Sequence, residues 1–274
     1  MNAQSYAKRR KRFLLQSAVW YVFLGAMSYY LTELMAFYLF CGIYDVSRNS
    51  HLDSRLVYRY FFGNGTPTWA LAPFNILMDL LTLPHINKKI YQMHDLPVAC
   101  RQEIEQVLQA ARSENLVEQL EERVENIKRG MIFFKWYGIN LDNSIAVPTF
   151  NTEYRYIKTI GVSIFNKNES TDEHFGPLRA TLRVLFSIND IKDRGSYLRL
   201  RKLENHWCEN KLFIFDDTLS HQSINQTDVT RYCLFIDILR RSQCRVLLNF
   251  IVDRLGVVLL KCKFIFYGSW VPIT

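Results

Sequence analysis

The sequence predicts an antiparallel β domain, either a barrel or a two-sheet jelly roll, preceded by helices and by an N-terminal membrane segment. Three observations predict this arrangement. A long uncharged stretch lies near the N-terminus, apolar residues then recur at helical spacing between residues 97 and 129, and strand-like runs follow between residues 156 and 239. No helical pattern separates these runs, so the strands are expected to pair antiparallel. The 274 residues, 49% of them hydrophobic, can build a sizeable core and exclude a disordered chain.

The positive charge of the chain is concentrated at one end. Lys8–Arg12 supplies +5 of the net charge of +8, so the rest of the chain carries only +3. A nucleic-acid-binding protein spreads Lys and Arg over a face of its fold. The distribution therefore excludes a globally basic nucleic-acid binder, and nucleic acid is not expected as a partner. The six cysteines include no CxxC pair, which favours scattered thiols over a disulfide framework or a zinc site.

The predicted membrane segment occupies residues 1–45. Phe13–Thr32 is a 20-residue run without charge that directly follows the basic cluster, and about 20 apolar residues can span a bilayer core. The run exceeds the apolar region of a signal peptide, and no small-residue cleavage site follows it. We therefore expect a retained anchor. A second apolar stretch, Trp69–Ile86, contains Asp79 and two prolines and is expected to be an interfacial or re-entrant segment, or a buried helix.

The region of residues 46–130 is predicted to be mainly helical. Between Pro97 and Arg129, apolar residues keep helical spacing, and Ser113–Asn115 lies where one helix would end and the next begin. The apolar positions are Ile104, Val107, Leu108, Ala111, Leu116, Leu120, Val124 and Ile127. The repeat is too short for a coiled coil, so we expect an amphipathic helix pair packed on the following domain.

Five strand-like runs make up the predicted β domain of residues 131–241. They are Tyr156–Phe165, Arg179–Ile188, Ser196–Leu203, Lys211–Phe215 and Arg231–Leu239. Side chains alternate across a strand, so one face of the first run is apolar while the other carries Ser163, and the corresponding faces of the second and last runs carry Arg183 and Arg231. Those polar faces could be solvated or could line an interior that holds an anion. The extension of residues 242–274 is expected to be a packed helix or strand, or a membrane-surface segment.

Two histidines and two arginines are the candidate functional residues. His174 lies in a turn that opens the second run, and His221 lies just past the fourth. Alone, the histidines could be structural imidazoles. However, Arg183 follows His174 by nine residues and Arg231 follows His221 by ten. Two imidazoles for a metal and two guanidiniums for a dicarboxylate are what an iron enzyme that uses 2-oxoglutarate needs.

At these residues the sequence resembles the aspartyl/asparaginyl β-hydroxylase family, which includes the bacterial lipid A hydroxylases. The resemblance covers residues 133–240 and is carried by GVSIF around Ser163, HFGPLRATLR from His174, Trp207, FIFDDTLSH ending at His221, and Arg231 with the following FIDIL. Upstream, FFKWYG and the stretch of residues 72–97 resemble the lipid A hydroxylase branch.

The resemblance implies a catalytic core folded as a double-stranded β-helix, with Fe(II) as cofactor and 2-oxoglutarate and O2 as co-substrates. His174 and His221 would bind Fe(II). Arg231, helped by Ser163, would hold the distal carboxylate of 2-oxoglutarate. Arg183 would lie near the other end of the co-substrate or near the metal.

Three positions near the motifs bear on the metal site. Asp216 and Asp217 carry carboxylates, and Gly176 has no side chain that could bind a metal. Asp216 and Asp217 could be metal carboxylates, but their place in the family motif favours a role in shaping the loop. Non-haem iron oxygenases usually add a carboxylate to two histidines, and the lipid A branch has an Asp where this chain has Gly176. The aspartyl/asparaginyl branch also has Gly there, so water would complete the coordination. A vacant position could also admit a halide, which makes a halogenase a remote alternative.

Three functions remain open at this stage. The first is a membrane-anchored Fe(II)/2-oxoglutarate hydroxylase that acts on an unactivated C–H bond of a lipid acyl chain. The second is a hydroxylase of Asp or Asn side chains in a protein. The third is a membrane-bound binding or scaffold protein without catalysis. Because Fe(II) and 2-oxoglutarate are supplied in the cytoplasm, the catalytic domain is expected to face the cytoplasm.

Overall fold

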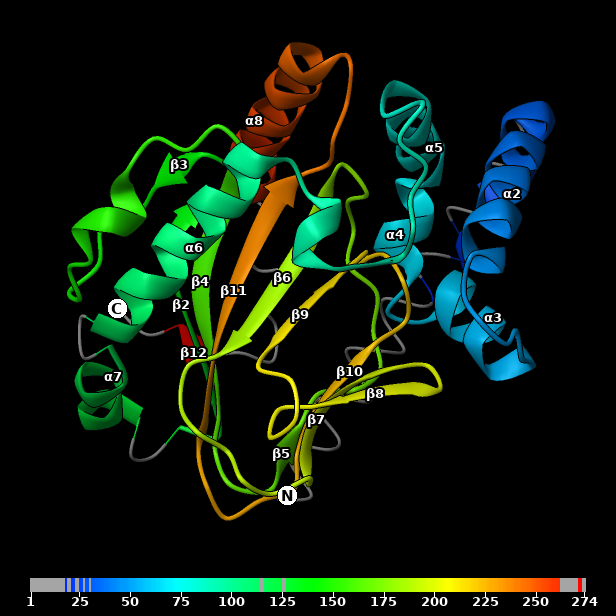
Figure 1. Ribbon diagram of the computed structural model, residues 1–274. Coiled ribbons are helices and arrows are strands. Elements are labelled where there is room, and N and C mark those ends of the chain that lie inside the picture. Colours follow the sequence, from blue (N-terminus) through cyan, green and yellow to red (C-terminus); the bar gives the residue numbers. More distant parts are fainter. Residues whose placement is uncertain are drawn as a thin grey trace.

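The computed structural model describes residues 31–113, 116–124, 127–261 and 271–272, together with isolated positions between Ala18 and Tyr29. Its centre is a pair of β-sheets, and helices lie on one side and across one face of this pair (Figure 1). The helices are α2 (Thr32–Ser47), α3 (Ser54–Phe62), α4 (Thr66–Ala70), α5 (Ala72–Leu81), α6 (Val98–Ser113), α7 (Leu116–Val124) and α8 (Arg245–Lys261).

The strands β4 to β11 alternate between the two sheets, except that β7 and β8 form a hairpin within the smaller sheet. In the larger sheet, β4 (Ile157–Phe165), β11 (Arg231–Leu239), β6 (Thr181–Ser187) and β9 (Leu212–Phe215) are neighbours in that order. The smaller sheet has the order β5 (Glu169–Ser170), β10 (Gln222–Asn225), β7 (Ser196–Leu200), β8 (Leu203–His206). This alternation is the strand order of a jelly roll. The larger sheet is extended by β2 (Arg129–Trp136), β12 (Val271–Pro272) and β1 (Ile90–Tyr91), while β3 (Ile139–Asn140) pairs with β2.

The prediction of an antiparallel, mostly β core is confirmed. The five predicted strand-like runs correspond to β4, β6, β7, β9 and β11. The sequence did not reveal β2 or the short strands β5, β8 and β10, which have two to four residues. β9 is equally short but stood out because its four residues are all apolar, whereas β5, β8 and β10 are largely polar and too short to complete an alternating pattern.

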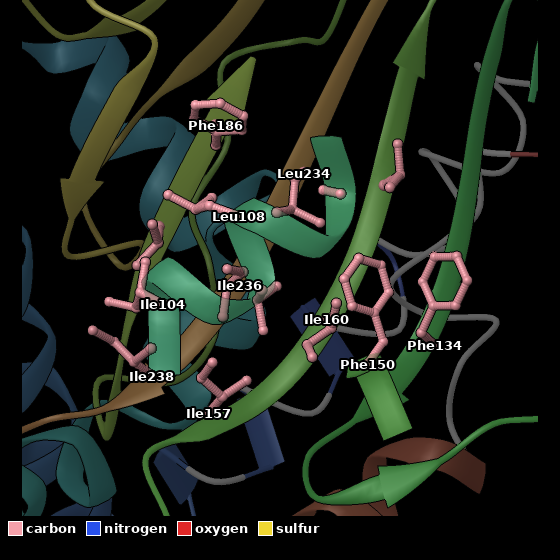
Figure 2. Packing of buried hydrophobic residues seen from close by; sticks show 14 of the residues in the cluster. Ile104, Leu108, Phe134, Phe150, Ile157, Ile160, Phe186, Leu234, Ile236 and Ile238 are labelled. Atoms are coloured by element: carbon pink, nitrogen blue, oxygen red, sulfur yellow. The ribbon is translucent and has the colours of Figure 1, made fainter. Parts of the chain in front are cut away.

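The outer face of the larger sheet packs against α6. Side chains such as Ile160, Leu234 and Ile236 point from the strands toward Ile104 and Leu108 of the helix (Figure 2). The prediction of an amphipathic helix pair is confirmed by α6 and α7, although residues 114 and 115 between them lie outside the described residues. Because this face is filled by apolar side chains, the alternating inward face of the same strands turns toward the smaller sheet.

The helices α2 to α5 form a separate cluster beside the loops of the jelly roll. Their own core includes Leu56, Tyr60 and Trp69, and it also contains Phe175 from the loop before β6. The hydroxyl of Thr68 donates a hydrogen bond of 3.0 Å to the carbonyl of Gly176. Asn75 donates to the carbonyl of Pro177 and accepts from the backbone N–H of Arg179. The helical cluster therefore holds the loop that carries His174.

The prediction of a membrane segment, and with it a membrane-anchored location, is wrong for the described part of the chain, where no helix is both long and apolar enough to cross a bilayer. The run after Thr32 forms α2, whose 16 residues rise about 24 Å, short of the roughly 30 Å of a bilayer core. Trp69–Ile86 is divided between α4 and α5, with Met78 buried. Most of residues 13–30 lie outside the described residues. The expected cytoplasm-facing orientation depended on the anchor and is withdrawn with it.

The C-terminal extension forms α8, so one of the expected alternatives, a packed helix, is what the structure contains. Leu248 and Val252 are fully buried against the main core. The ammonium group of Lys158 on β4 donates a 2.9 Å hydrogen bond to Asp253 of α8. The domain boundaries given above stay a prediction.

Candidate active site

A cavity of about 200 Å³ lies between the two sheets and is called the inter-sheet cavity below. Its walls are largely aromatic or aliphatic, with Phe133, Trp136, Phe215 and Phe235 among them. The polar side chains that line it are Ser163, Thr171, His174, Arg183, Asp217, His221, Ser223 and Asp237. Four of the sequence-predicted site residues, Ser163, His174, Arg183 and His221, therefore meet in one cavity.

The two histidines face each other across a single antiparallel bridge. The backbone N–H of each donates to the carbonyl of the other, at 2.8 and 2.9 Å, and the ring centroids are 4.2 Å apart. Nδ1 of His174 lies 2.8 Å from the carbonyl oxygen of Asp172, and Nδ1 of His221 lies 2.8 Å from that of Leu219. A carbonyl can only accept, so Nδ1 donates in both rings. This leaves the lone pair of each neutral ring on Nε2.

Burial also favours neutral imidazoles. It lowers the pKa of His221 to about 4, and burial followed by the nearby His221 lowers the pKa of His174 to about 4. Both rings are therefore neutral near pH 7. Two neutral imidazoles with fixed tautomers and adjacent Nε2 atoms are suited to binding a transition-metal ion.

Asp217 is the carboxylate nearest to this pair. Its Oδ1 lies 3.3 Å from Nε2 of His221 and is buried without a hydrogen-bond partner, while Oδ2 lies 3.1 Å from a guanidinium nitrogen of Arg183. A Cβ added at Gly176 would overlap the Asp217 carboxylate. Glycine is therefore required at position 176, because the carboxylate of Asp217 fills the space that a side chain there would need. Among the described residues, no group of three or more His, Cys, Asp and Glu side chains forms a metal site.

Arg183 is neutralised by acids of the protein itself. Its Nε donates a 2.6 Å hydrogen bond to Asp237, its neighbour across the β6–β11 pair, and its second acidic partner is Asp217. Burial alone would lower the pKa of Arg183, but Asp217 and Asp237 raise it well above its ordinary value. Arg183 therefore stays charged and fixes the position of Asp217.

Arg231 lies next to the inter-sheet cavity, against its lining residues Phe165 and Ser223, and has no acidic partner among the described residues. It is fully buried and stacks over Phe165 at 4.1 Å. Its guanidinium donates to the hydroxyl of Ser223 at 2.7 Å and to the carbonyl of Ile224 at 3.2 Å, while Nε has no partner. Burial lowers the pKa of Arg231 to about 10. A buried cation without a counter-charge costs several kcal/mol, so an anion beside Arg231 would be stabilised.

Ser163 lies on the same face of β4 as Phe165, the ring on which Arg231 stacks. It is buried on β4, faces the inter-sheet cavity and donates a 3.2 Å hydrogen bond to the carbonyl of Cys233 on β11. Its hydroxyl oxygen keeps acceptor capacity, and the hydroxyl can rotate to donate elsewhere. Ser163 and Ser223 thus add two hydroxyls next to the unpaired guanidinium.

Asp216 shapes the loop and does not face the cavity. Arg48 and Asn87 donate to its Oδ2 at 2.6 and 2.7 Å, and the backbone N–H of Thr218 donates to Oδ1 at 3.0 Å. Burial would raise the pKa of Asp216, but Arg48 and then Arg179 hold it well below its ordinary value. This loop-shaping role was expected for both neighbouring acids, and the geometry gives it to Asp216 alone.

Three polar residues of the site were not singled out by sequence reasoning. Ser223 contacts Arg231, Asp237 neutralises Arg183, and Thr171 lines the inter-sheet cavity. Asp237 carried a usable signal, because it is the acid in a strand that is apolar between Tyr232 and Ile236, and it lies on the same face as Arg231 and Phe235. Ser223 and Thr171 gave no comparable signal.

The two sheets and the inter-sheet cavity define a jelly-roll protein with a pair of imidazoles in its interior. The chain belongs to the aspartyl/asparaginyl beta-hydroxylase family, whose family model matches residues 98–241. The predicted family is thereby confirmed.

The similarity to individual proteins is partial. The ornithine lipid ester-linked acyl 2-hydroxylase of Rhizobium tropici is 33% identical over 87 residues, which are 31% of this chain and 30% of that protein. The viral collagen prolyl hydroxylase of Paramecium bursaria Chlorella virus 1 has a TM-score of 0.33 at 9% identity and covers 47% of this chain and 92% of its own. A 2OG-Fe(II) oxygenase-family oxidoreductase from Burkholderia pseudomallei has a TM-score of 0.31 at 14% identity, with 48% and 80% covered. At these TM-scores the two structures bear on neither the substrate nor the cofactor of this chain.

Proposed function

We propose that the protein is an Fe(II)- and 2-oxoglutarate-dependent hydroxylase that adds oxygen to an unactivated C–H bond of a lipid acyl chain. One observation carries the proposal. The cavity that holds the paired histidines has next to it a buried arginine without an acidic partner, Arg231, which stacks on the lining residue Phe165. A pair of imidazoles suited to a metal and a cation suited to a carboxylate support the proposal from the same interior.

The donor set fits Fe(II). His174 and His221 would supply Nε2, and the hydrogen bonds from each Nδ1 to a backbone carbonyl fix the orientation of both rings. Asp217 would act from beside the metal, with its unpartnered Oδ1 accepting a hydrogen bond from a group bound there. Asp217 would thus place a carboxylate beside the metal, whereas Gly176 offers no carboxylate to bind it.

The surroundings of Arg231 fit the distal carboxylate of 2-oxoglutarate. Arg231 would bind it through the guanidinium, and Ser163 and Ser223 would add hydroxyl contacts. A carboxylate there would also supply the counter-charge that Arg231 lacks. Fe(II) and 2-oxoglutarate, when bound, supply the activation of O2, and turnover releases succinate and CO2.

The rest of the cavity favours an apolar substrate. Phe133, Trp136 and Phe235 form an aromatic wall in edge-to-face contact, with ring centroids 4.7 and 5.2 Å apart. Such a wall excludes water from the reacting centre. The similarity to a lipid acyl hydroxylase supports the same substrate class. An Asp substrate would need a further cation, and Arg183 is already neutralised by two acids.

Mass spectrometry of lipids tests this proposal. Purified protein with Fe(II), 2-oxoglutarate and O2 should add one oxygen atom to an acyl chain in a total membrane lipid extract. His221→Ala should abolish the product, whereas Arg199→Ala, a change on β7 outside the inter-sheet cavity, should leave it unchanged. Modification of added peptides rich in Asp and Asn, with no change in lipids, would contradict the acyl substrate.

A further inference from the structure

A second cavity, of about 490 Å³, is lined by basic side chains and is called the basic cavity below. Its wall contains Arg155, Arg241, Arg245 and His85, and it shares no lining residue with the inter-sheet cavity. It lies where β11 ends and α8 begins, close to the end of α5 (Figure 1). The hydroxyl of Ser242 donates to the carbonyl of Leu81, which ties these elements together.

The three arginines of the basic cavity have no acidic partner within the described ranges. The adjacent Arg240 offers a contrast, because its guanidinium donates a 2.6 Å hydrogen bond to Asp79. The nearby carboxylate of Glu103 is already occupied, accepting from the backbone N–H groups of Arg155 and Tyr156 at 2.9 Å and of Ile157 at 3.2 Å. Three guanidiniums against the single nearby carboxylate of Glu103 leave the cavity with a local excess of positive charge.

Two of these cations are held beside the same aromatic ring. The guanidinium carbons of Arg155 and Arg245 lie 5.6 and 5.8 Å from the centroid of Tyr156. Nη1 of Arg245 is buried without a hydrogen-bond partner. Like charges gathered around one ring repel each other, and a bound anion reduces the repulsion. The unpartnered Nη1 supplies a donor for that anion.

The first turn of α8 adds to the same potential. The helix begins at Arg245 and has 17 residues, so its unpaired N–H groups and the positive end of its dipole lie at the basic cavity. Ser242 is also in the wall, and its hydroxyl accepts from the backbone N–H of Cys244 at 3.0 Å. Arginine forks and a helix N-terminus together match the geometry of a phosphate group.

We propose that the basic cavity binds the phosphate group of a phosphate ester, a site distinct from the proposed hydroxylase centre. The ester could be a phospholipid headgroup or a free, soluble phosphate ester, since both present the same chemistry. Exposed apolar side chains adjoin the site, with Ile86 and Val246 both 78% exposed. These side chains would contact the apolar part of a lipid whose headgroup occupies the cavity.

Calorimetric titration of the full-length chain tests the site. The probes are glycerol 3-phosphate, bicelles of phosphatidylcholine, and phosphatidylcholine bicelles that contain phosphatidylglycerol. The double variant Arg155→Gln/Arg245→Gln is compared with Arg194→Gln/Arg199→Gln, a charge-matched control whose arginines are paired with Glu209 and Glu204.

We expect the double variant to weaken phosphate-ester binding at least tenfold and the control to change it less than twofold. Tighter binding to bicelles with phosphatidylglycerol than to bicelles without it identifies a lipid headgroup as the source. Binding of glycerol 3-phosphate with equal response to both bicelles identifies a soluble ester. Equal affinities in wild type and double variant, or no binding by the wild type, would overturn the proposal. If the double variant does not fold, the single variant Arg241→Gln, at an exposed residue, takes its place. It should also weaken phosphate-ester binding at least tenfold.

Discussion

The carboxylate of Asp217 occupies the space beside Gly176 that any side chain at position 176 would need. The two positions are also joined by the backbone, because the N–H of Gly176 donates a 2.7 Å hydrogen bond to the carbonyl of Asp217. An acid at either position would point at the same place next to the histidines. The chain uses Asp217, which Arg183 holds in place at 3.1 Å.

This relationship predicts the effect of restoring the missing acid. Gly176→Asp should reduce Fe(II) retention and succinate formation at least tenfold, because the new side chain displaces Asp217 and overpacks the site. The double variant Gly176→Asp/Asp217→Gly removes the overlap with the Asp217 side chain, leaves the close approach to the backbone carbonyl of residue 217, and should regain part of the Fe(II) binding. Metal analysis after desalting measures both. Full Fe(II) retention by the single variant would contradict the assigned overlap.

Arg231→Met should separate stability from co-substrate binding. Replacing a buried, unpaired cation by an apolar side chain of similar length should leave the protein as stable or more stable by about 1–3 kcal/mol. The same change should remove the stabilisation that 2-oxoglutarate gives to the Fe(II) protein, about 2.7 kcal/mol at a hundredfold excess over Kd in the wild type. Anaerobic thermal unfolding with and without 2-oxoglutarate measures both effects. A variant that 2-oxoglutarate still stabilises would exclude Arg231 as the carboxylate receptor.

Asp216→Asn should destabilise the protein in a pH-dependent way. The fully buried carboxylate contacts Arg48 at 2.6 Å, and its loss should cost about 3–5 kcal/mol near pH 7. Its pKa is held below the ordinary value of 3.8, so its contribution is complete above that value and is lost as the pH falls through the folded-state pKa. Urea unfolding from pH 7 to pH 3 should therefore show a constant difference from the wild type down to about pH 5 and a smaller one below pH 4. A difference that grows with acidity would have the wrong sign.

Arg183 and Asp237 should be strongly coupled. Arg183→Met leaves two buried acids without their cation and should cost about 3–5 kcal/mol of unfolding free energy. Adding Asp237→Asn to that variant removes one of the stranded charges and should recover part of the loss. A double-mutant cycle by chemical unfolding gives the coupling free energy, and values that simply add would contradict the pairing seen at 2.6 Å.

The long strands of the larger sheet and the histidine–arginine spacing could be read from the sequence because alternation is a local property. Strand β11 is buried throughout, yet its alternation still separated Leu234 and Ile236, which face α6, from Arg231 and Phe235. The membrane segment could not be judged in this way. Hydropathy reports only that Leu34–Tyr44 is apolar, whereas the end of α2 packs on α3 to α5 and places Arg48 against Asp216.

Sequence reasoning could not assign different roles to two residues that are adjacent in the chain. Asp216 and Asp217 are adjacent acids in one motif, and the turn after β9 sends the first toward Arg48 and the second toward His221. That direction depends on partners from distant segments. The basic cavity is hidden for the same reason, because Arg155 and Arg245 meet only where the start of β4 lies against α8.

Succinate formation from 2-oxoglutarate is the measurement that tests the central claim most directly. The wild-type protein with Fe(II) and O2 should convert 2-oxoglutarate to succinate, even without a lipid, at a slow uncoupled rate. His221→Ala and Arg231→Met should each abolish this conversion, and Arg199→Ala should not. Turnover that persists in both site variants, or a wild type that binds no Fe(II) and forms no succinate with membrane lipids present, would contradict the assignment of this cavity as an Fe(II)/2-oxoglutarate centre.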